Sequence, residues 1–176
     1  MATNENPYEY EISNENFDED FDEDYYDESM EDFDEEWDAG VDVLDVLSRL
    51  EDSVPSVRYK ALETLRELDP ATLAQHAGAV VVSLKDSDWA VRREALETLR
   101  KLDPATLAQH AGAVVARLKD SDWAVKCRAL VTLGKLEPAT LAQHVYAIFA
   151  RLEDSDGYVR MRALHTLHKL EPATLA

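Results

Sequence analysis

The sequence predicts an all-α solenoid of four helical-hairpin repeats, preceded by an acidic arm. The first observation is a repeated block, Leu-Asp-Pro-Ala-Thr-Leu-Ala-Gln-His, which stands at 68–76 and 102–110, returns with Glu for Asp at 136–144, and begins again at Leu170. The second is its spacing, because each copy starts 34 residues after the one before. The third is that apolar residues recur at helical spacing between the copies. Self-similarity at a fixed period of this length is typical of stacked helical repeats.

Charge divides the chain into two parts. The net charge is -19, and residues 1–38 hold 18 Asp or Glu but no Lys or Arg, whereas the remainder holds 19 acids and 18 bases. Cys127 is the only cysteine, which excludes an internal disulfide. No apolar run approaches the ~20 residues that span a bilayer, and the N-terminus lacks the pattern of a signal or transit peptide. We therefore expect a cytoplasmic or nuclear protein with no membrane partner.

The acidic arm, residues 1–38, carries aromatic residues at a four-residue step. Dense like charge and frequent Asp predict that it is disordered by itself. A four-residue step brings side chains close together on a helix, so the arm is suited to becoming helical on a basic partner. Such segments resemble the histone-binding tails of histone chaperones and acidic activation segments. A purely solubilising leader is the alternative. The aromatic residues that carry the pattern are Phe17, Phe21, Tyr25, Phe33 and Trp37.

The second helix of each repeat, helix B, has the clearer pattern. Val, Ala and three Leu recur at offsets that form one apolar face. Asp88, Asp122 and Asp156 are expected N-caps, whereas the first copy has Val54 at the cap and Pro55 at the first helical position. The repeats are predicted at 39–69, 70–103, 104–137 and 138–171, with 172–176 as the start of a further repeat. Helix B is predicted at about 55–68, 88–102, 122–136 and 156–170.

The first helix of each repeat, helix A, is predicted from Pro70 to about Lys85 in the second copy and at equivalent places elsewhere. Gly78 and Gly112 fall in its middle, at a usual cost of about 1 kcal/mol against Ala. The fourth copy has Tyr146 at that position, so a positive φ is not required there. We therefore predict a continuous or gently kinked helix A.

The two ends of the array differ in polarity. Helix A of the first copy carries Asp42, Asp45 and Arg49, as expected of an N-terminal capping helix. After the fourth repeat, only the five residues 172–176 follow. The sequence therefore predicts an open apolar edge there, which is covered by further chain or by end-to-end self-association.

The pattern Asp-x4-Val-Arg-x2-Ala-x3-Leu resembles HEAT repeats, in the short form named for phycobilisome lyases, over residues 41–171. The resemblance implies a right-handed superhelix with helix B on its concave face. It also implies a hydrogen-bonded ladder between neighbouring repeats, formed by turn aspartates and helix B bases. Lysine lacks the fork of an arginine and makes one rung weaker. The ladder residues would be Asp52, Asp86, Asp120 and Asp154, with Arg58, Arg92, Lys126 and Arg160.

No catalytic or cofactor site is legible. The aligned histidines His76, His110 and His144 belong to repeats roughly 10 Å apart, too far to share one metal. Deoxyhypusine hydroxylases of the same family bind iron through His-Glu pairs, and no His here is followed by Glu. Cys127 has no adjacent base, and no phosphate loop or paired-acid site is present. We expect no enzyme activity, no cofactor and no metal.

The predicted function is a non-catalytic scaffold that binds a protein or peptide on the basic helix B face. The arm would bind basic proteins or mask that face. A nucleic-acid-linked or histone-chaperone-like role is the alternative, although nucleic acid itself is not the favoured partner. Trp89 and Trp123 either form an exposed pair or cover their own turns. The candidate binding residues are Tyr59, Arg93, Arg100, Arg128, Arg162, His165, His168, Trp89 and Trp123.

Overall fold

The structure is a computed structural model that describes residues 42–170. The chain divides into two units, 1–36 and 37–176, and every described residue belongs to the second. The predicted acidic arm at 1–38 and the predicted start of a further repeat at 172–176 lie outside the described residues.

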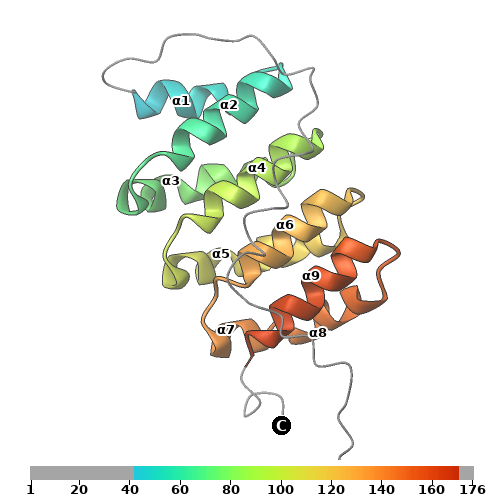
Figure 1. Ribbon diagram of the computed structural model, residues 1–176. Helices are drawn as coiled ribbons and strands as arrows, with labels where there is room; N and C mark the ends of the chain where they lie inside the picture. Colours follow the sequence, from blue (N-terminus) through green and yellow to red (C-terminus); the bar gives the residue numbers. More distant parts are fainter. Residues whose placement is uncertain (1–41, 171–176) are drawn as a thin grey trace, which may run out of the picture. The chain divides into compact units, whose positions relative to one another are not determined.

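The described part of the chain consists of helices and turns, which confirms the prediction of an all-α solenoid. The B helices α2, α4, α6 and α9 lie side by side in one layer, and the A helices lie in a second layer behind them (Figure 1). The helices are α1 (Val43–Arg49), α2 (Pro55–Arg66), α3 (Pro70–Ser83), α4 (Trp89–Arg100), α5 (Pro104–Ala116), α6 (Trp123–Leu133), α7 (Pro138–Ala142), α8 (Val145–Phe149) and α9 (Gly157–His168), with short 3-10 turns at Arg117–Lys119 and Ala150–Glu153.

The B helices begin where the sequence predicts. Asp88 accepts hydrogen bonds from the N–H groups of the second and third helical residues, and the N-caps Asp122 and Asp156 do the same. Val54 makes no side-chain cap, and Pro55 follows it at the first helical position. Each B helix ends two or three residues earlier than predicted. The last turn closes with tighter bonds, such as Leu102 N–H to Leu99 O at 3.1 Å.

The A helices α3 and α5 run without a break through Gly78 and Gly112, as predicted. The prediction of a continuous or gently kinked helix is wrong in the fourth repeat, where α7 ends at Ala142 and a separate helix, α8, begins at Val145. His144 lies between them at φ -109° and ψ 5°, outside helical geometry. Two sequence changes accompany the break: Glu137 makes no side-chain cap, unlike Asp69 and Asp103, and Val145 replaces an Ala, which lowers helix propensity. Tyr146 in place of Gly acts in the opposite direction, because Gly is the poorer helix former.

The core lies between the two layers and continues from repeat to repeat. Leu62, Leu96 and Leu130 are fully buried, and such side chains each contribute about 2 kcal/mol on burial. A threonine also joins each pair of neighbouring B helices. The hydroxyls of Thr98, Thr132 and Thr166 donate to the carbonyls of those three leucines in order, each at 3.2 Å. The leucine carbonyl and the next threonine are therefore fixed points of the repeat interface.

Candidate binding surface

An ion-pair ladder fixes one repeat to the next. Arg58 donates through Nε and Nη2 to the two carboxylate oxygens of Asp86, both at 2.7 Å. Arg92 binds Asp120 in the same way at 2.9 and 2.7 Å. Lys126 forms the third rung, with Nζ at 2.8 and 2.9 Å from the two oxygens of Asp154. The 28-residue spacing is the same in each rung, so the ladder follows the repeat.

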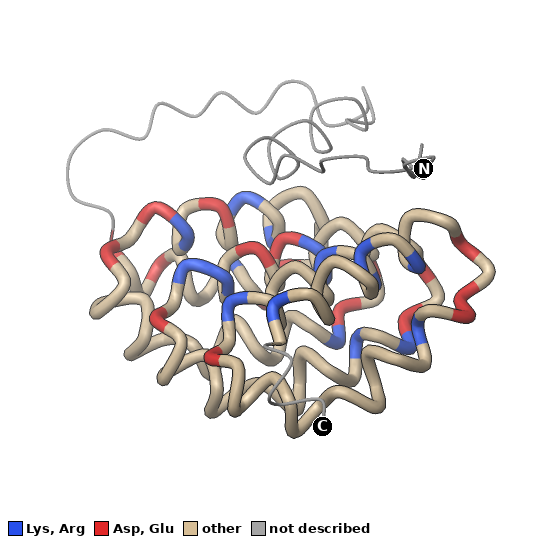
Figure 2. Tube along the Cα trace, turned by 60° about the horizontal axis from the view of Figure 1, so that its bottom comes forward, with Lys and Arg blue, Asp and Glu red and all other residues tan. Residues whose placement is uncertain are grey.

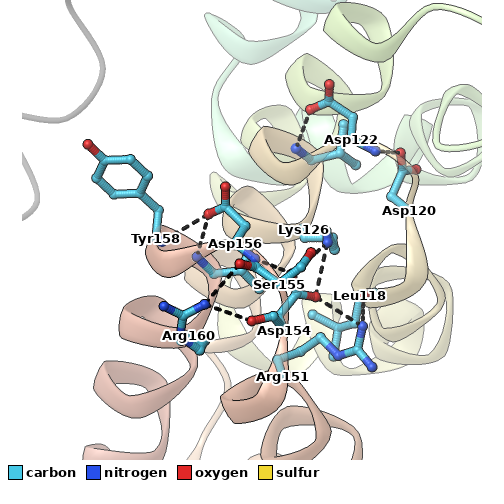
Figure 3. A network of polar contacts seen from close by, with 12 residues as sticks. Leu118, Asp120, Asp122, Lys126, Arg151, Asp154, Ser155, Asp156, Tyr158 and Arg160 are labelled. Carbon is cyan, nitrogen blue, oxygen red and sulfur yellow. Dashed lines mark hydrogen bonds and ion pairs between the residues drawn. The ribbon is translucent and has the colours of Figure 1, made fainter.

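The arginine rungs also close their own turns. Nη1 of Arg92 donates to the carbonyls of Asp86 at 2.9 Å and Ser87 at 3.0 Å. Lys126 has a single side-chain nitrogen, which binds the carboxylate of Asp154, so it has no second nitrogen for the carbonyls of its own turn. Arg151 lies beside the lysine rung, donating to Asp154 at 3.3 Å and to the Leu118 carbonyl at 3.0 Å (Figure 3). Arg117 makes the equivalent contact with Asp120 at 3.3 Å, so each of these two carboxylates receives a second cation from its own repeat.

The ladder carboxylates are held in their charged form. Burial by itself raises the pKa of Asp86, Asp120 and Asp154. The hydrogen bond from the cation of the preceding repeat and a backbone N–H two residues further on outweigh burial, so the pKa of each carboxyl lies below its ordinary value. The hydrogen bond to Asp120 correspondingly raises the pKa of Arg92. The ladder therefore stays ionised at neutral pH.

A second ion-pair network lies on the B helices, where the sequence suggested a basic groove. Glu97 accepts from Arg100 at 2.8 Å and from Arg128, one repeat later, at 2.8 Å. Glu94 lies 3.0 Å from Arg66. These two acids neutralise much of the positive charge over α2 and α4. Glu94 follows Arg66 by 28 residues, which is also the spacing between the partners of each ladder ion pair. A search of the sequence for oppositely charged residues at this spacing would have found the pair.

Glu94 is unusual among these acids because it is only 2% exposed. Its Oε1 atom contacts Arg66 but makes no hydrogen bond among the described residues, because the contact has the distance of an ion pair without hydrogen-bond alignment. Burial raises the pKa of Glu94 to about 7, against the opposing effect of Arg66. This carboxyl therefore changes its charge near neutral pH.

The structure separates the predicted binding residues by depth. Tyr59 and Arg162 are only 7% and 5% exposed, so they lie beneath the surface. Trp89 and Trp123 are partly buried and pack against the core, which fits the interpretation that they cover their turns. The ring of Trp123 lies 5.6 Å from that of Tyr158 in the next repeat. His168 is exposed, and the residues at intermediate depth are Arg93, Arg100, Arg128 and His165.

The described residues include one thiol, which is buried. Cys127 is buried, and burial raises the pKa of its thiol to about 12, so it is not a thiolate at neutral pH. Within residues 42–170, no three His, Cys, Asp or Glu side chains gather closely enough to hold a metal. No helix in that range is long and apolar enough to cross a membrane.

The fold matches known solenoids, although no family model and no curated protein matches the chain. An engineered protein superposes with a TM-score of 0.58 at 19% identity, covering 73% of this chain and 62% of that one. A designed armadillo repeat protein in complex with the peptide (KR)4 superposes with a TM-score of 0.61 at 15% identity, covering 72% and 63%. The chain thus spans less than two thirds of the length of these structures.

The complex of CpcE and CpcF of phycocyanin lyase from Nostoc sp. also matches, with a TM-score of 0.48 at 16% identity, covering 82% of this chain and 71% of that one. The likeness to the engineered protein and to the designed armadillo protein, at 19% and 15% identity, establishes the fold alone. The chain is therefore a helical-repeat solenoid. Membership of the HEAT family in particular stays a prediction.

Proposed function

We propose that this chain is a non-catalytic scaffold that binds a segment of another protein on the surface of its B helices. The favoured segment is acidic, and it lies over α6 and α9. One observation carries the proposal: neither α6 nor α9 contains an Asp or Glu, whereas α2 and α4 together contain three. The C-terminal half of this surface is therefore the half whose bases are least neutralised by their own helices.

The charge distribution supports this placement. The A helices α3, α5, α7 and α8 carry no charged residue. Figure 2 shows the charged positions gathered on the B helices and turns, with long stretches of the trace free of charge. Over α2 and α4 the bases are held by Glu94 and Glu97. Beyond α4, Lys135 and Lys169 are exposed and add positive charge directly after α6 and α9, two helices that contain no carboxylate.

The solved neighbours suggest how such a surface is used. A designed armadillo protein of related fold was solved with the basic peptide (KR)4. The exposed bases that follow α6 and α9, Lys135 and Lys169, are instead complementary to an acidic segment. A surface of this kind binds an extended segment mainly through steering and salt-sensitive contacts.

The test uses two labelled probes, an eight-residue Glu-Asp repeat peptide and the (KR)4 peptide, with fluorescence anisotropy. We expect the acidic probe to bind the array more tightly than (KR)4, and its affinity to fall with salt because exposed charges are screened beyond about 8 Å at 0.15 M. Lys135→Glu combined with Lys169→Glu is expected to weaken acidic-probe binding by about tenfold. Equal binding of the two probes contradicts the proposal.

Lys85→Glu is the matched control. It makes the same charge change at an exposed position in the turn between α3 and α4, away from α6 and α9. We expect it to leave binding of the acidic probe within about twofold of the unsubstituted chain. A loss as large as that of the double variant shows that net charge, rather than this surface, governs binding.

The acidic arm carries the second part of the proposal. Residues 1–38 hold 18 acids and no base, so the arm suits a basic partner, or it competes for the chain's own B-helix surface. Removing residues 1–38 is expected to strengthen binding of the acidic probe if the arm masks that surface. Unchanged binding of the acidic probe, together with lost binding of histones in a pull-down, assigns the arm to basic partners instead.

A further inference from the structure

The last repeat exposes two apolar side chains at positions where earlier repeats bury theirs. Leu164 in α9 is 53% exposed, whereas the same position is fully buried in the other B helices, at Leu62, Leu96 and Leu130. Met161 is 38% exposed, and its equivalents Tyr59 and Cys127 are 7% and 5% exposed. In the earlier repeats the following repeat covers these positions. Among the described residues, nothing follows α9 to do so.

The first repeat exposes a different set. Val57, Thr64 and Leu68 are partly exposed, although their equivalents are buried in all three later repeats. Those equivalents stay buried in the fourth repeat too, at Val159, Thr166 and Leu170, and no described repeat follows it. The cover at these positions therefore comes from the preceding repeat. The α2 edge and the α9 edge are the two halves of one repeat interface.

The polar groups of the two edges are complementary as well. Arg160 donates through Nη1 to the carbonyls of Asp154 at 2.9 Å and Ser155 at 3.0 Å, as the ladder arginines do (Figure 3). In Arg58 and Arg92 the Nε and Nη2 atoms then bind the aspartate of the next repeat. For Arg160 no described residue supplies that carboxylate.

Asp52 is the other half of this rung. It is the turn aspartate of the first repeat, and its Oδ1 accepts from the N–H of Val54 at 2.7 Å, as Asp86, Asp120 and Asp154 accept from their own turns. Those later aspartates also receive a cation from the preceding repeat. Asp52 has no preceding repeat among the described residues.

We propose that the α9 edge of one copy binds the α2 edge of a second copy, head to tail. Arg160 would pair with Asp52 of the second copy, and Thr64 of the second copy would donate to the Leu164 carbonyl. Leu164 and Met161 would then be covered. This is the interface that joins the repeats within one chain, continued across two chains. Because the two edges differ, the contact is heterologous and does not close in a pair, so copies add in a row.

The net charge of the chain makes this association depend on salt concentration. Each chain carries a net charge of -19, which repels a second copy at low ionic strength. At 0.15 M salt, interactions between exposed charges are screened beyond about 8 Å, whereas a buried rung is screened much less. Association of copies therefore strengthens with salt, whereas binding of an acidic peptide weakens.

Sedimentation velocity of the full chain tests the inference, over concentrations from about 1 μM to about 1 mM. We expect the mass to grow beyond a dimer as concentration rises. Leu164→Glu removes the α9 edge, and Asp52→Arg removes the α2 edge. Each variant by itself is expected to associate at least about tenfold more weakly. Their mixture is expected to form a 1:1 dimer and nothing larger, because only one complementary junction remains.

Other outcomes overturn the inference. A chain that stays monomeric over the whole concentration range overturns it directly. An Asp52→Arg variant that associates as well as the unsubstituted chain shows that like edges pair instead. Val82→Glu makes a comparable change at a position on α3 that is 70% exposed and lies off both edges, so it must leave association unchanged. If circular dichroism shows that Asp52→Arg is unfolded, Asp52→Asn keeps the turn acceptor, and it is expected to weaken association as well.

Discussion

The third and fourth repeats share most of their sequence but differ in how firmly they are held. The third begins helix α5 with Asp103, which accepts from the N–H groups of Ala105 and Thr106 at 3.0 Å, and α5 continues for 13 residues. The fourth begins with Glu137, which caps nothing, and its A helix is divided into α7 and α8 of five residues each. The third repeat is joined to the second by arginine, and the fourth is joined to the third by lysine.

The comparison shows that the repeat interface tolerates the loss of single contacts. Three changes fall together in the last part of the array: Glu137 at a cap, Lys126 at a rung, and Val145 with Tyr146 in place of Ala and Gly. The core leucine and the threonine bond are nevertheless kept, since Leu141 is fully buried and Thr166 still donates to Leu130. Apolar burial and the threonine hydrogen bond therefore keep neighbouring repeats packed together. The ion-pair ladder and the helix caps change how stable that packing is.

The largest expected effect comes from removing an arginine rung. Asp120→Ala leaves Arg92 buried without its carboxylate, and breaking a buried pair typically costs about 3 to 5 kcal/mol. Thermal unfolding followed by circular dichroism should show a fall in Tm of about 10 °C. Asp154→Ala in the lysine rung should cost less, because a flexible ammonium reaches water more easily. An unchanged Tm for Asp120→Ala counts against the ladder.

The next effect concerns pH. The pKa of Glu94 is raised from 4.5 to about 7 in the folded protein, so the folded state binds a proton more readily than the unfolded state. The stability from this proton is fully present below about pH 4.5 and is lost as the pH rises through about 7. Glu94→Gln should remove this part of the pH dependence and raise stability at pH 8 by about 2 to 3 kcal/mol.

Chemical unfolding of both proteins between pH 5 and pH 8 measures this difference, and the other titrating groups cancel in the comparison. The low pKa values of Asp86, Asp120 and Asp154 act in the opposite sense, since their stability is lost only as the pH falls below the ordinary value of 3.8. Parallel curves for the two proteins over this range would show that Arg66 keeps Glu94 ionised.

Much of the fold follows from the sequence because the repeat shows each position four times. The buried faces, the B-helix caps and the weaker first cap are all readable from aligned residues. The surface is less predictable, because it depends on which side chains meet across repeats. Arg162 is buried although its charge predicts exposure, and Glu97 is shared by two arginines from different repeats. The break at His144 accompanies one added methylene in the capping side chain, Glu137, and Val145 in place of Ala, neither of which changes the apolar pattern of the repeat.

A smaller gain is expected from restoring the arginine rung. Lys126→Arg provides a fork for the two oxygens of Asp154 and a nitrogen for the carbonyls of its own turn, as Arg92 does. We expect stability to rise by about 1 kcal/mol, the net value of one or two added hydrogen bonds. Chemical unfolding checks this. Arg92→Lys is the mirror-image control and should lose a similar amount, and a stabilising Arg92→Lys would contradict the comparison of the two rungs.

The smallest effect concerns the cap of α7. Glu137→Asp shortens the side chain to the length that accepts from two backbone N–H groups in Asp69 and Asp103. A good N-cap contributes about 1 kcal/mol, so we expect a gain of about 0.5 to 1 kcal/mol in the free energy of unfolding and slower amide exchange in Pro138–Ala142. The reverse change, Asp103→Glu, should cost a similar amount.

The two cap variants together separate the causes of the break at His144. If the cap governs it, Asp103→Glu should speed amide exchange around His110, the residue that aligns with His144. If Val145 and Tyr146 govern it, α5 stays continuous after Asp103→Glu, and Glu137→Asp stabilises α7 without joining it to α8. Val in place of Ala costs less than about 1 kcal/mol in a helix, and Tyr in place of Gly is favourable, so a full cap is large enough to decide between them.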